Sequence, residues 1–398
     1  MPALDDELNR RLALLREQNL FRELRRVDSA PGPRLEIAGK TLLNFSSNDY
    51  LGLANHPTLK AAASEAVNQF GAGAGASRLV CGSLAPFHQL EETLAAFKGT
   101  GAALTFATGY AAALGTITAL AGKDDILILD KLVHACIVDA AKLSGAKLRI
   151  FAHNDLNDLE EKLKWADRAA PIENGKRKAA ILVVTESIFS MDGDAAPLRE
   201  MVALKEKYGA WLMVDEAHAT GVFGRNGRGR ADELGVSNQI EIQMGTLGKA
   251  LGASGGYICG SRPLIDFLVN RARSFIFSTA PVPAAAAAAT AGIQLAQSAA
   301  GEQLREKLRT RIAELNAALY LPPAAQGSPI IPLILGEEAK AMAAATRLRE
   351  QGIFVPAIRY PTVARGAARL RITLSAANTG ADVATLADAL NQIVNPNA

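Results

Sequence analysis

The sequence predicts an α/β protein, with a mostly parallel central sheet in a large domain and a small C-terminal α+β domain. Between residues 104 and 259, short apolar runs alternate with longer stretches rich in Ala, Leu and charged residues. The runs are apolar throughout, as strands are when helices cover both faces of a parallel sheet. After the alanine-rich segment Ala284–Ala289 the pattern changes to a long helix and several shorter elements, which indicates a second domain.

The expected elements follow in chain order. Residues 1–50 are an N-terminal segment that opens with acids and bases on a helical repeat. Residues 51–285 form the large domain, with strands at Leu104–Phe106, Ile126–Leu129, Leu148–Phe151, Ile181–Val184, Trp211–Val214, Ile242–Met244 and Tyr257–Cys259. Residues 286–398 form the small domain, with a helix to about Leu319, strands at Ile330–Ile334 and Leu370–Leu374, and helices that begin near Glu338 and Asp382.

Charge and cysteine content exclude several functional classes. The net charge is only +3, so no broad basic face for nucleic acid is expected. Three scattered cysteines lack metal-ligand spacing and make a poor disulfide framework, and the N-terminus does not resemble a signal peptide. We therefore expect a cytoplasmic protein without a bound metal.

One uncharged stretch, residues 99–122, is long enough to span a bilayer. It is dominated by Gly, Thr and Ala instead of Leu, Ile and Phe, and Thr108-Gly109-Tyr110 is typical of a turn in its middle. We expect no membrane span.

The strand Trp211–Val214 runs directly into Asp215-Glu216-Ala217-His218. Ligands of open α/β sheets gather at the carboxyl ends of the strands, so Asp215 and His218 stand at the correct place for a site. By itself the motif also fits a capping aspartate and a loop histidine.

A second motif, Thr246-Leu247-Gly248-Lys249, follows the next apolar run and opens into a glycine-rich segment. A lysine among small residues can be desolvated, which lowers its pKa and makes its amine nucleophilic enough to form a Schiff base. A surface lysine in a flexible loop is the alternative. A Walker phosphate loop is disfavoured because the glycine spacing is too short and no Ser or Thr follows the lysine.

The pair of motifs resembles the fold-type-I pyridoxal-phosphate enzymes. That chemistry needs a lysine for the Schiff base, a carboxylate that keeps the pyridine nitrogen protonated, and a group that orients the ring oxygen. The resemblance assigns these roles to Lys249, Asp215 and His218 in that order, and implies that the freed Lys249 amine then acts as the general base.

Upstream, a strand leads through Gly109 into a helix, an arrangement that directs backbone N–H groups at a phosphate. The resemblance implies a phosphate site made by the amides of Gly109 and Tyr110. It adds hydroxyl groups from Ser190, Thr246 and, from a neighbouring subunit, Thr279. It also implies that His134 stacks on the cofactor ring.

The whole chain resembles the α-oxoamine synthase family. The resemblance is carried by Asn44–Leu53, Thr185–Asp194, Val214–Gly221, Ser278-Thr279, Ala357–Val363 and Arg369–Leu374. It implies a decarboxylative condensation of an amino acid with an acyl thioester, here L-alanine with a pimeloyl thioester. Glycine with acetyl-CoA or succinyl-CoA is the alternative within the family, and the carrier of the acyl group, coenzyme A or acyl carrier protein, stays open.

The same resemblance implies four substrate-binding residues. Arg371 would pair with the amino-acid carboxylate, since a guanidinium group suits that planar fork. Asn48 would lie near the same carboxylate, Glu186 near the reacting centre and Arg22 near the acyl substrate, although Arg25 and Arg26 follow closely. The family also implies a homodimer with shared active sites.

Two other classes of protein are disfavoured by the sequence. Non-catalytic partner subunits of such synthases lose the Schiff-base lysine, which this chain keeps as Lys249. The glycines of residues 221–227 raise the possibility of a nicotinamide dehydrogenase, but they lack the G-x-G-x-x-G spacing.

Overall fold

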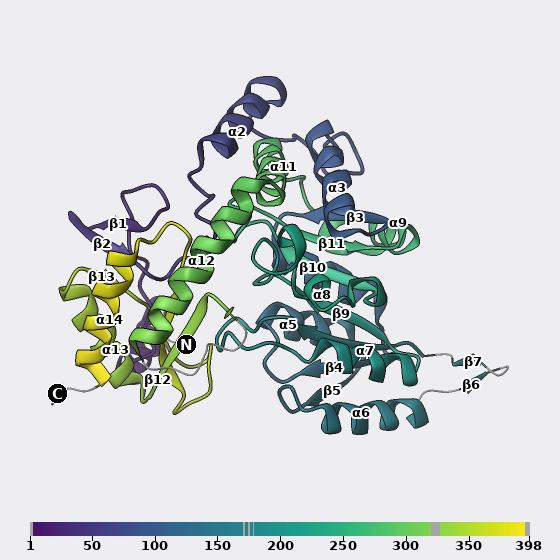
Figure 1. Ribbon diagram of the computed structural model, residues 1–398. Coiled ribbons are helices and arrows are strands. Elements are labelled where there is room, and N and C mark those ends of the chain that lie inside the picture. Colours follow the sequence, from purple (N-terminus) through teal and green to yellow (C-terminus); the bar gives the residue numbers. More distant parts are fainter. Residues whose placement is uncertain (1–2, 170–171, 174–175, 178, 320–326, 395–398) are drawn as a thin grey trace. The chain divides into compact units, whose positions relative to one another are not determined.

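The computed structural model describes residues 3–169, 172–173, 176–177, 179–319 and 327–394. Its internal contacts divide the chain into two compact units (Figure 1). Unit 1 comprises residues 1–47, 191–193 and 308–398, and unit 2 comprises residues 48–190 and 194–307. The division into three folding domains predicted above stays a prediction.

Unit 2 is built on a seven-stranded sheet. Its strands, in spatial order, are β3 (Ala102–Phe106), β11 (Gly256–Gly260), β10 (Ile242–Thr246), β9 (Trp211–Asp215), β8 (Ile181–Glu186), β4 (Ile126–Asp130) and β5 (Lys147–Phe151). Only β11 runs antiparallel to its neighbours. All seven runs predicted for the large domain are strands of this sheet, so the mostly parallel α/β class is confirmed.

Helices cover both faces of the sheet, which is why most of its strands are largely apolar; the edge strand β5 carries Lys147 and Arg149 and is only partly buried. Alternate residues of a strand point to opposite faces: Leu129 packs in one core with the helices α4, α5, α9 and α10, and Ile128 in the other with α6, α7 and α8. The bounds of these helices are α4 (Gly109–Leu120), α5 (Ala135–Ser144), α6 (Leu156–Ala169), α7 (Leu198–Lys207), α8 (Arg230–Glu233), α9 (Arg262–Arg271) and α10 (Arg273–Ile276).

A further helical group in unit 2 contains α2 (Pro57–Phe70), α3 (Ala85–Lys98) and α11 (Pro283–Gln297), with α11 packed on the other two. The helix predicted to run on to about Leu319 is two helices, because Ser298 adopts an extended conformation and its hydroxyl donates to the carbonyl of Leu295. The second of them is α12 (Ala299–Ala318), of which residues 299–307 belong to unit 2 and residues 308–318 to unit 1. Short elements complete the unit: β6 (Ile172–Glu173), β7 (Lys176–Arg177), η1 (Arg225–Gly227) and η2 (Ser237–Gln239).

Unit 1 contains two three-stranded sheets. One consists of β1 (Arg34–Ile37), β2 (Lys40–Asn44) and β13 (Ile353–Phe354), and the other of β12 (Ile330–Gly336), β15 (Ala368–Thr373) and β14 (Ala357–Ile358). The predicted strands at 330–334 and 370–374 are confirmed. The strands β1 and β2 were not predicted because they are short and mix charged with apolar residues. Since β2 pairs with β13, the start of the chain belongs to the same unit as its end.

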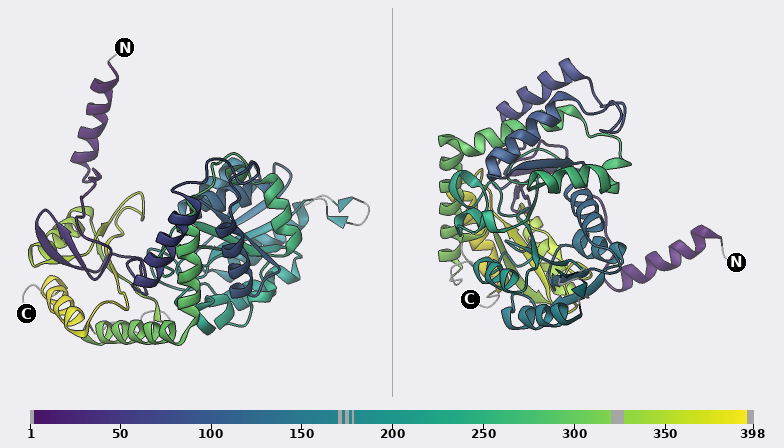
Figure 2. Two further views of the ribbon diagram at one scale, coloured as in Figure 1. Left: turned by 90° about the horizontal axis from the view of Figure 1, so that it is seen from above. Right: turned by 90° about the vertical axis from the view of Figure 1, so that its right-hand side faces the viewer.

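Three helices belong to unit 1: α1 (Leu4–Glu17), α13 (Glu338–Glu350) and α14 (Gly380–Val394). The last two begin where the sequence predicts helices. The helix α1 has no buried residue and extends away from the rest of its unit (Figure 2).

The uncharged stretch 99–122 is not one helix. It comprises β3 and α4, and Thr108 caps the start of α4 by accepting a hydrogen bond from the N–H of Ala111, so the turn predicted there is confirmed. Among the described residues, no helix is both long and apolar enough to cross a membrane.

Candidate active site

The predicted site residues of unit 2 follow strands whose carboxyl ends share one edge of the sheet. β8 ends at Glu186, β9 at Asp215 and β10 at Thr246. Glu186 and Asp215 are register partners across the β8–β9 pair, and Asp215 is the partner of Met244 across the β9–β10 pair. Parallel strands therefore bring together side chains that are up to 60 positions apart in the sequence.

Lys249 and His218 contact each other, as expected for one site. Lys249 Nζ lies 2.7 Å from His218 Nε2, and the other ring nitrogen, Nδ1, lies 2.5 Å from the hydroxyl group of Tyr50. The Tyr50 hydroxyl is also 3.3 Å from the side-chain oxygen of Asn48. These contacts form a hydrogen-bonded network that links the Lys249 amine to the His218 ring, the buried Tyr50 phenol and the Asn48 amide. The network can hold a proton at Lys249 Nζ or pass one to it.

Tyr50 was not predicted as a site residue. The only sequence signal was its place within Asn44–Leu53, one of the segments that carry the family resemblance. A tyrosine that is fully buried, as Tyr50 is, needs a hydrogen-bond partner for its hydroxyl group, and only the folded chain shows that this partner is His218.

Two buried carboxyl groups lie beside the lysine. Burial raises the pKa of Asp215, which the charge of Lys249 and the N–H of Ala217 oppose. Burial raises the pKa of Glu186 well above its usual value, the charge of Asp215 adds to this, and Lys249 opposes it. The Asp215 carboxylate accepts the N–H of Ala217 at 2.9 Å, and Glu186 Oε1 is buried without a hydrogen-bond partner in the part of the chain that the structure describes.

His134 occupies the N-terminal cap of α5, where its Nδ1 accepts the N–H of Cys136 at 3.2 Å. Exclusion of water around the ring lowers the pKa of His134, and the charge of Asp215 opposes this shift while that of Lys249 adds to it. Since both charges act on His134, the ring lies near the groups described above. A neutral imidazole at this place suits stacking on a planar ring.

The predicted phosphate site is the start of α4. A Cβ atom built on Gly109 would lie 3.8 Å from the Cβ of Thr246, so the turn and the threonine are neighbours. Beneath the turn, β11 passes so closely that a Cβ on Gly256 would lie 2.5 Å from the carbonyl oxygen of Thr108, which only glycine permits. The first N–H groups of a helix have no acceptor within the helix and favour an anion.

These groups fit pyridoxal phosphate. The start of α4 offers donors to a phosphate, Asp215 offers a buried carboxylate to a ring nitrogen, and Lys249 offers an amine. The Thr246 hydroxyl donates to the carbonyl of Gly255 at 2.9 Å, so its contact with a phosphate stays a prediction. Ser190 is buried a few residues beyond the end of β8. The side chain of Tyr110 is exposed and donates to Asp139 at 2.6 Å, which leaves its backbone N–H as the predicted contribution.

Three further predicted residues belong to other segments of the chain. Arg22 and Arg371 belong to unit 1, where Arg371 is buried and donates to the Thr373 hydroxyl at 3.0 Å. Thr279 belongs to unit 2, but it is exposed and forms an isolated bridge with Ser77. The roles proposed for all three stay predictions.

A histidine that the sequence analysis missed lies at the same edge of the sheet. His153 follows β5, and its two ring nitrogens lie 2.9 Å from an oxygen of Asp130 and 2.7 Å from an oxygen of Asp194. Burial lowers the pKa of His153, but the hydrogen bonds and charges of the two carboxylates outweigh this and raise it to about 10. The ring also packs edge-on against Phe189, with centroids 4.4 Å apart.

This ion-paired histidine ties three strand-end loops together. Asp130 ends β4 and accepts the N–H of Leu132 in the turn that leads to His134. Asp194 lies in the loop after β8, beyond Ser190, and its carbonyl accepts the N–H of Phe189. No sequence signal identified His153, because its two partners are 23 positions before it and 41 positions after it.

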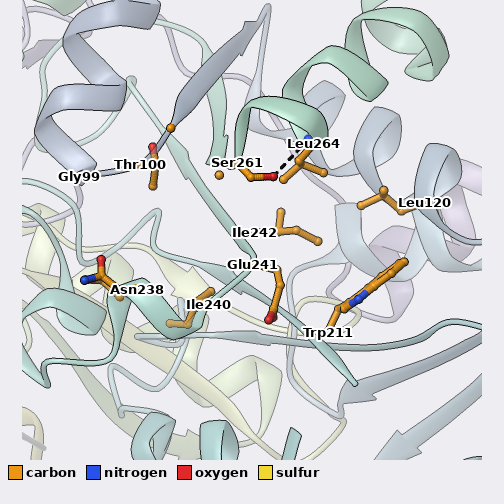
Figure 3. A pocket seen from close by; sticks show the side chains of 13 residues that line it. Gly99, Thr100, Leu120, Trp211, Asn238, Ile240, Glu241, Ile242, Ser261 and Leu264 are labelled. Atoms are coloured by element: carbon orange, nitrogen blue, oxygen red, sulfur yellow. Dashed lines mark hydrogen bonds between the residues drawn. The ribbon is translucent and has the colours of Figure 1, made fainter. Parts of the chain in front are cut away.

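One cavity of unit 2 lies away from this site. A hollow of about 450 Å³ lies at the opposite edge of the sheet, between the starts of β9 and β10 and the end of β11 (Figure 3). Trp211, Leu264 and Ser261 line it, and Glu241 is the single charged side chain among the described residues of the lining. The groups described above with shifted pKa values, Glu186, Asp215, His134 and His153, lie at the carboxyl edge, where ligands of such sheets bind.

Comparison with known proteins agrees with this geometry. A family model described as aminotransferase class I and II matches residues 40–390. The 8-amino-7-oxononanoate synthase of Geobacter sulfurreducens is 47% identical over 385 residues, 96% of this chain and 96% of the relative.

Two solved structures are similar over most of their length. Serine palmitoyltransferase from S. paucimobilis, with a bound pyridoxal phosphate–myriocin aldimine, has a TM-score of 0.90 and 30% identity, covering 100% of this chain and 99% of that one. The 8-amino-7-oxononanoate synthase of Francisella tularensis has a TM-score of 0.74 and 29% identity, covering 89% and 97%. The chain belongs to the class I and II aminotransferase family, with the fold type I and the dependence on pyridoxal phosphate that its sequence predicts.

Proposed function

We propose that this chain is an 8-amino-7-oxononanoate synthase, which condenses L-alanine with a pimeloyl thioester and releases carbon dioxide and the free thiol carrier, a step of biotin biosynthesis. The observation that carries the proposal is identity of 47% with a synthase of that name over 96% of both chains. The catalytic motifs fall inside the matched region, and Lys249 and His218 are in contact.

When bound, pyridoxal phosphate supplies the electron sink that stabilises negative charge at the α-carbon of the amino acid. The chain supplies the rest. Lys249 would bind the cofactor and then take the α-proton at Nζ, with His218 and Tyr50 fixing the position of the amine. A catalytic base must reach the proton that it removes, and the half-buried Lys249 follows the carboxyl end of β10, at the edge of the sheet where ligands bind.

The two carboxyl groups would have different tasks. Asp215, held by the N–H of Ala217, would keep its charge against the protonated ring nitrogen. Glu186 has a strongly raised pKa, so it would hold a proton and donate it as a hydrogen bond near the reacting centre. His134 would hold the ring plane. Arg371 and Asn48 would bind the carboxylate of alanine, and Arg22 would lie near the acyl donor.

We further propose a homodimer in which Thr279 completes the neighbouring site. Its support is an apolar surface around the Ser77–Thr279 bridge: Leu79, Val80, Phe277 and Val282 are each about half or more exposed in the single chain. Such a contiguous apolar surface marks an interface. Sedimentation should give a dimer, and a Phe277→Asp, Val80→Asp double variant should give monomers of low activity.

The free thiols of Cys81, Cys136 and Cys259 accord with a reducing compartment, and a cytoplasmic location is part of the proposal. Fractionation of the source cells should place the protein with cytoplasmic marker enzymes.

The test of function is a matrix of substrates. Purified protein supplied with pyridoxal phosphate is mixed with L-alanine or glycine and with pimeloyl-, acetyl- or succinyl-CoA, and released thiol and the amino-ketone product are measured. We expect turnover with L-alanine and pimeloyl-CoA. Turnover only with glycine and a short acyl donor would keep the reaction class and replace the substrates. A pimeloyl carrier-protein thioester that reacts much faster than pimeloyl-CoA would identify the natural carrier.

A further inference from the structure

A second cavity lies wholly within unit 1, and Arg22 is the one residue of its described lining to which a role is given above. It measures about 430 Å³ and is lined by the segment from Phe21 to Arg25, by α13 and by the residues around β14. Four of its lining residues are arginines and one is a glutamate. We call this cavity the arginine pocket and define its cationic set as Arg22, Arg25, Arg349 and Arg359.

Arg359 is the buried member of this set, with 9% of its surface exposed. One of its terminal nitrogens donates to the carbonyl of Phe21, and the other lies 2.7 Å from the thioether sulfur of Met342, a weak acceptor. Its Nε is buried without a hydrogen-bond partner among the described residues. A guanidinium group has five N–H donors to satisfy, so the protein leaves much of the hydrogen-bonding capacity of Arg359 unused.

Three other buried arginines of the chain each pair with a carboxylate. Arg78 pairs with Glu91 at 2.9 Å, Arg305 pairs with Glu302 at 2.7 Å, and Arg369 pairs with Asp192. No such ion pair with a carboxylate occurs for Arg359 in the described part of the chain. Its charged neighbours instead include Arg22 and Arg25, which, after burial, lower its pKa further. Glu23 is the single acidic group in the lining, so the pocket has an excess of positive charge that an anion would neutralise.

The rest of the lining indicates which anion fits. Phe21, Met342 and Phe354 present apolar surface beside the arginines, which suits a short methylene chain that ends in a charge. A carboxylate can accept two N–H groups from one guanidinium. An acyl donor with a carboxylate at its far end has this combination, whereas an ordinary fatty acyl donor ends in a methyl group.

We propose that the arginine pocket binds the free carboxylate of the acyl donor and that Arg359 is its main contact. This inference rests on the proposed function, because it assumes a pimeloyl thioester. The proposal also distinguishes between three arginines that are close in sequence. Arg22 and Arg25 line the pocket and add positive charge, whereas Arg26 does not line it. Arg359 thereby becomes the residue that selects a dicarboxylic over a monocarboxylic donor.

The experiment compares two donors that differ only at the far end, pimeloyl-CoA and heptanoyl-CoA. The wild-type enzyme should prefer pimeloyl-CoA by roughly 100-fold or more in kcat/KM, because a site built for a polar group rejects an analogue that lacks it. In Arg359→Met, kcat/KM for pimeloyl-CoA should fall by roughly 30- to 1,000-fold, mainly through KM, while heptanoyl-CoA is used as well as before. The spectral response to L-alanine should not change.

The matched control is Arg347→Met, which removes an exposed arginine of the same helix, α13, that does not line the pocket; both donors should be used as by the wild type. If Arg359→Met does not fold, Arg25→Met removes an exposed member of the pocket, and a loss of roughly 3- to 10-fold confined to pimeloyl-CoA is expected.

Equal losses on both donors would overturn the inference and assign the pocket to the phosphates of the carrier. Unchanged kinetics in the variants would overturn it as well. A wild-type enzyme that does not use pimeloyl-CoA, but does use another acyl donor, would contradict the proposed function itself and remove the basis of this inference; that result is seen before any variant is made.

Discussion

The two edges of the central sheet each have a lysine and a carboxylate, and they differ in how these groups are satisfied. At the amino edge, Glu241 binds Lys205 at 2.7 Å with one oxygen and the N–H of Leu212 at 2.8 Å with the other. At the carboxyl edge, Lys249 lies against His218, and Glu186 Oε1 has no hydrogen-bond partner among the described residues. Buried polar groups are normally satisfied. Among the described residues, Gln243 Oε1 near the start of β10 also lacks a hydrogen-bond partner, so the difference between the edges lies in the carboxylates: Glu241 is paired with a lysine and an N–H group, whereas Glu186 Oε1 is left without a hydrogen bond. The volume of the amino-edge cavity does not by itself identify a ligand site.

The largest expected effect is that of removing Lys249. In Lys249→Ala, turnover should fall on the order of 1,000-fold or more, because the nucleophile and base are lost together, while some pyridoxal phosphate still binds without a covalent bond. The matched variant is Lys205→Ala at the other edge, with activity within about twofold of the wild type. Steady-state rates and absorbance spectra measure both. Near wild-type turnover by Lys249→Ala would remove the lysine from the mechanism.

A smaller effect is expected for the carboxylates. Asp215→Asn removes the charge that would face the ring nitrogen while keeping the shape, and should lower kcat roughly 100- to 1,000-fold. Its counterpart, Glu241→Gln, removes the counter-charge of the buried Lys205 and should cost about 1–3 kcal/mol of stability without changing kcat. If the two substitutions have similar effects on kcat, the difference between the edges has no catalytic meaning.

His153 at the carboxyl edge should make stability depend on pH. Its pKa is raised from about 6.5 in unfolded chains to about 10, so its contribution to folding is fully present below about pH 6.5 and is lost as the pH rises to about 10. The difference in Tm between wild type and His153→Asn should therefore be largest at low pH and disappear near pH 10.

Cofactor affinity provides a second measure for His153. Its pairing with Asp130 and Asp194 holds the loops of His134 and Ser190, so the variant should also bind pyridoxal phosphate several-fold more weakly. A difference in Tm that is constant between pH 6 and pH 10 would contradict the ion-paired state of the histidine.

The smallest effect is expected in the amino-edge cavity. Trp211 is 42% exposed, so Trp211→Ala should lower the free energy of unfolding by about 1 kcal/mol and leave KM and kcat unchanged. Chemical denaturation and steady-state kinetics provide the test. An increase of several-fold in KM for either substrate would show that this cavity takes part in binding.

Much of the fold could be predicted because its signal is local. Most of the seven strands of the unit 2 sheet are buried apolar runs bounded by turns, and such a run can be recognised from neighbouring residues alone. The edge strand β5 is only partly buried. The weak elements were missed for the same reason: β1 and β2 are short and carry charges, and what stabilises them is pairing with each other and with β13.

The sequence by itself determined which chemistry is present. It contains a lysine and an Asp-x-x-His motif at two strand ends and a glycine turn before a helix, and the local spacing of residues limits what these groups can do. The tertiary structure alone decided which groups meet. Tyr50 reaches His218 across 168 positions, His153 is held between Asp130 and Asp194, and Arg359 is buried among arginines. The reason is physical: burial and pairing set the charge and position of a group, and both depend on neighbours that only the folded chain supplies.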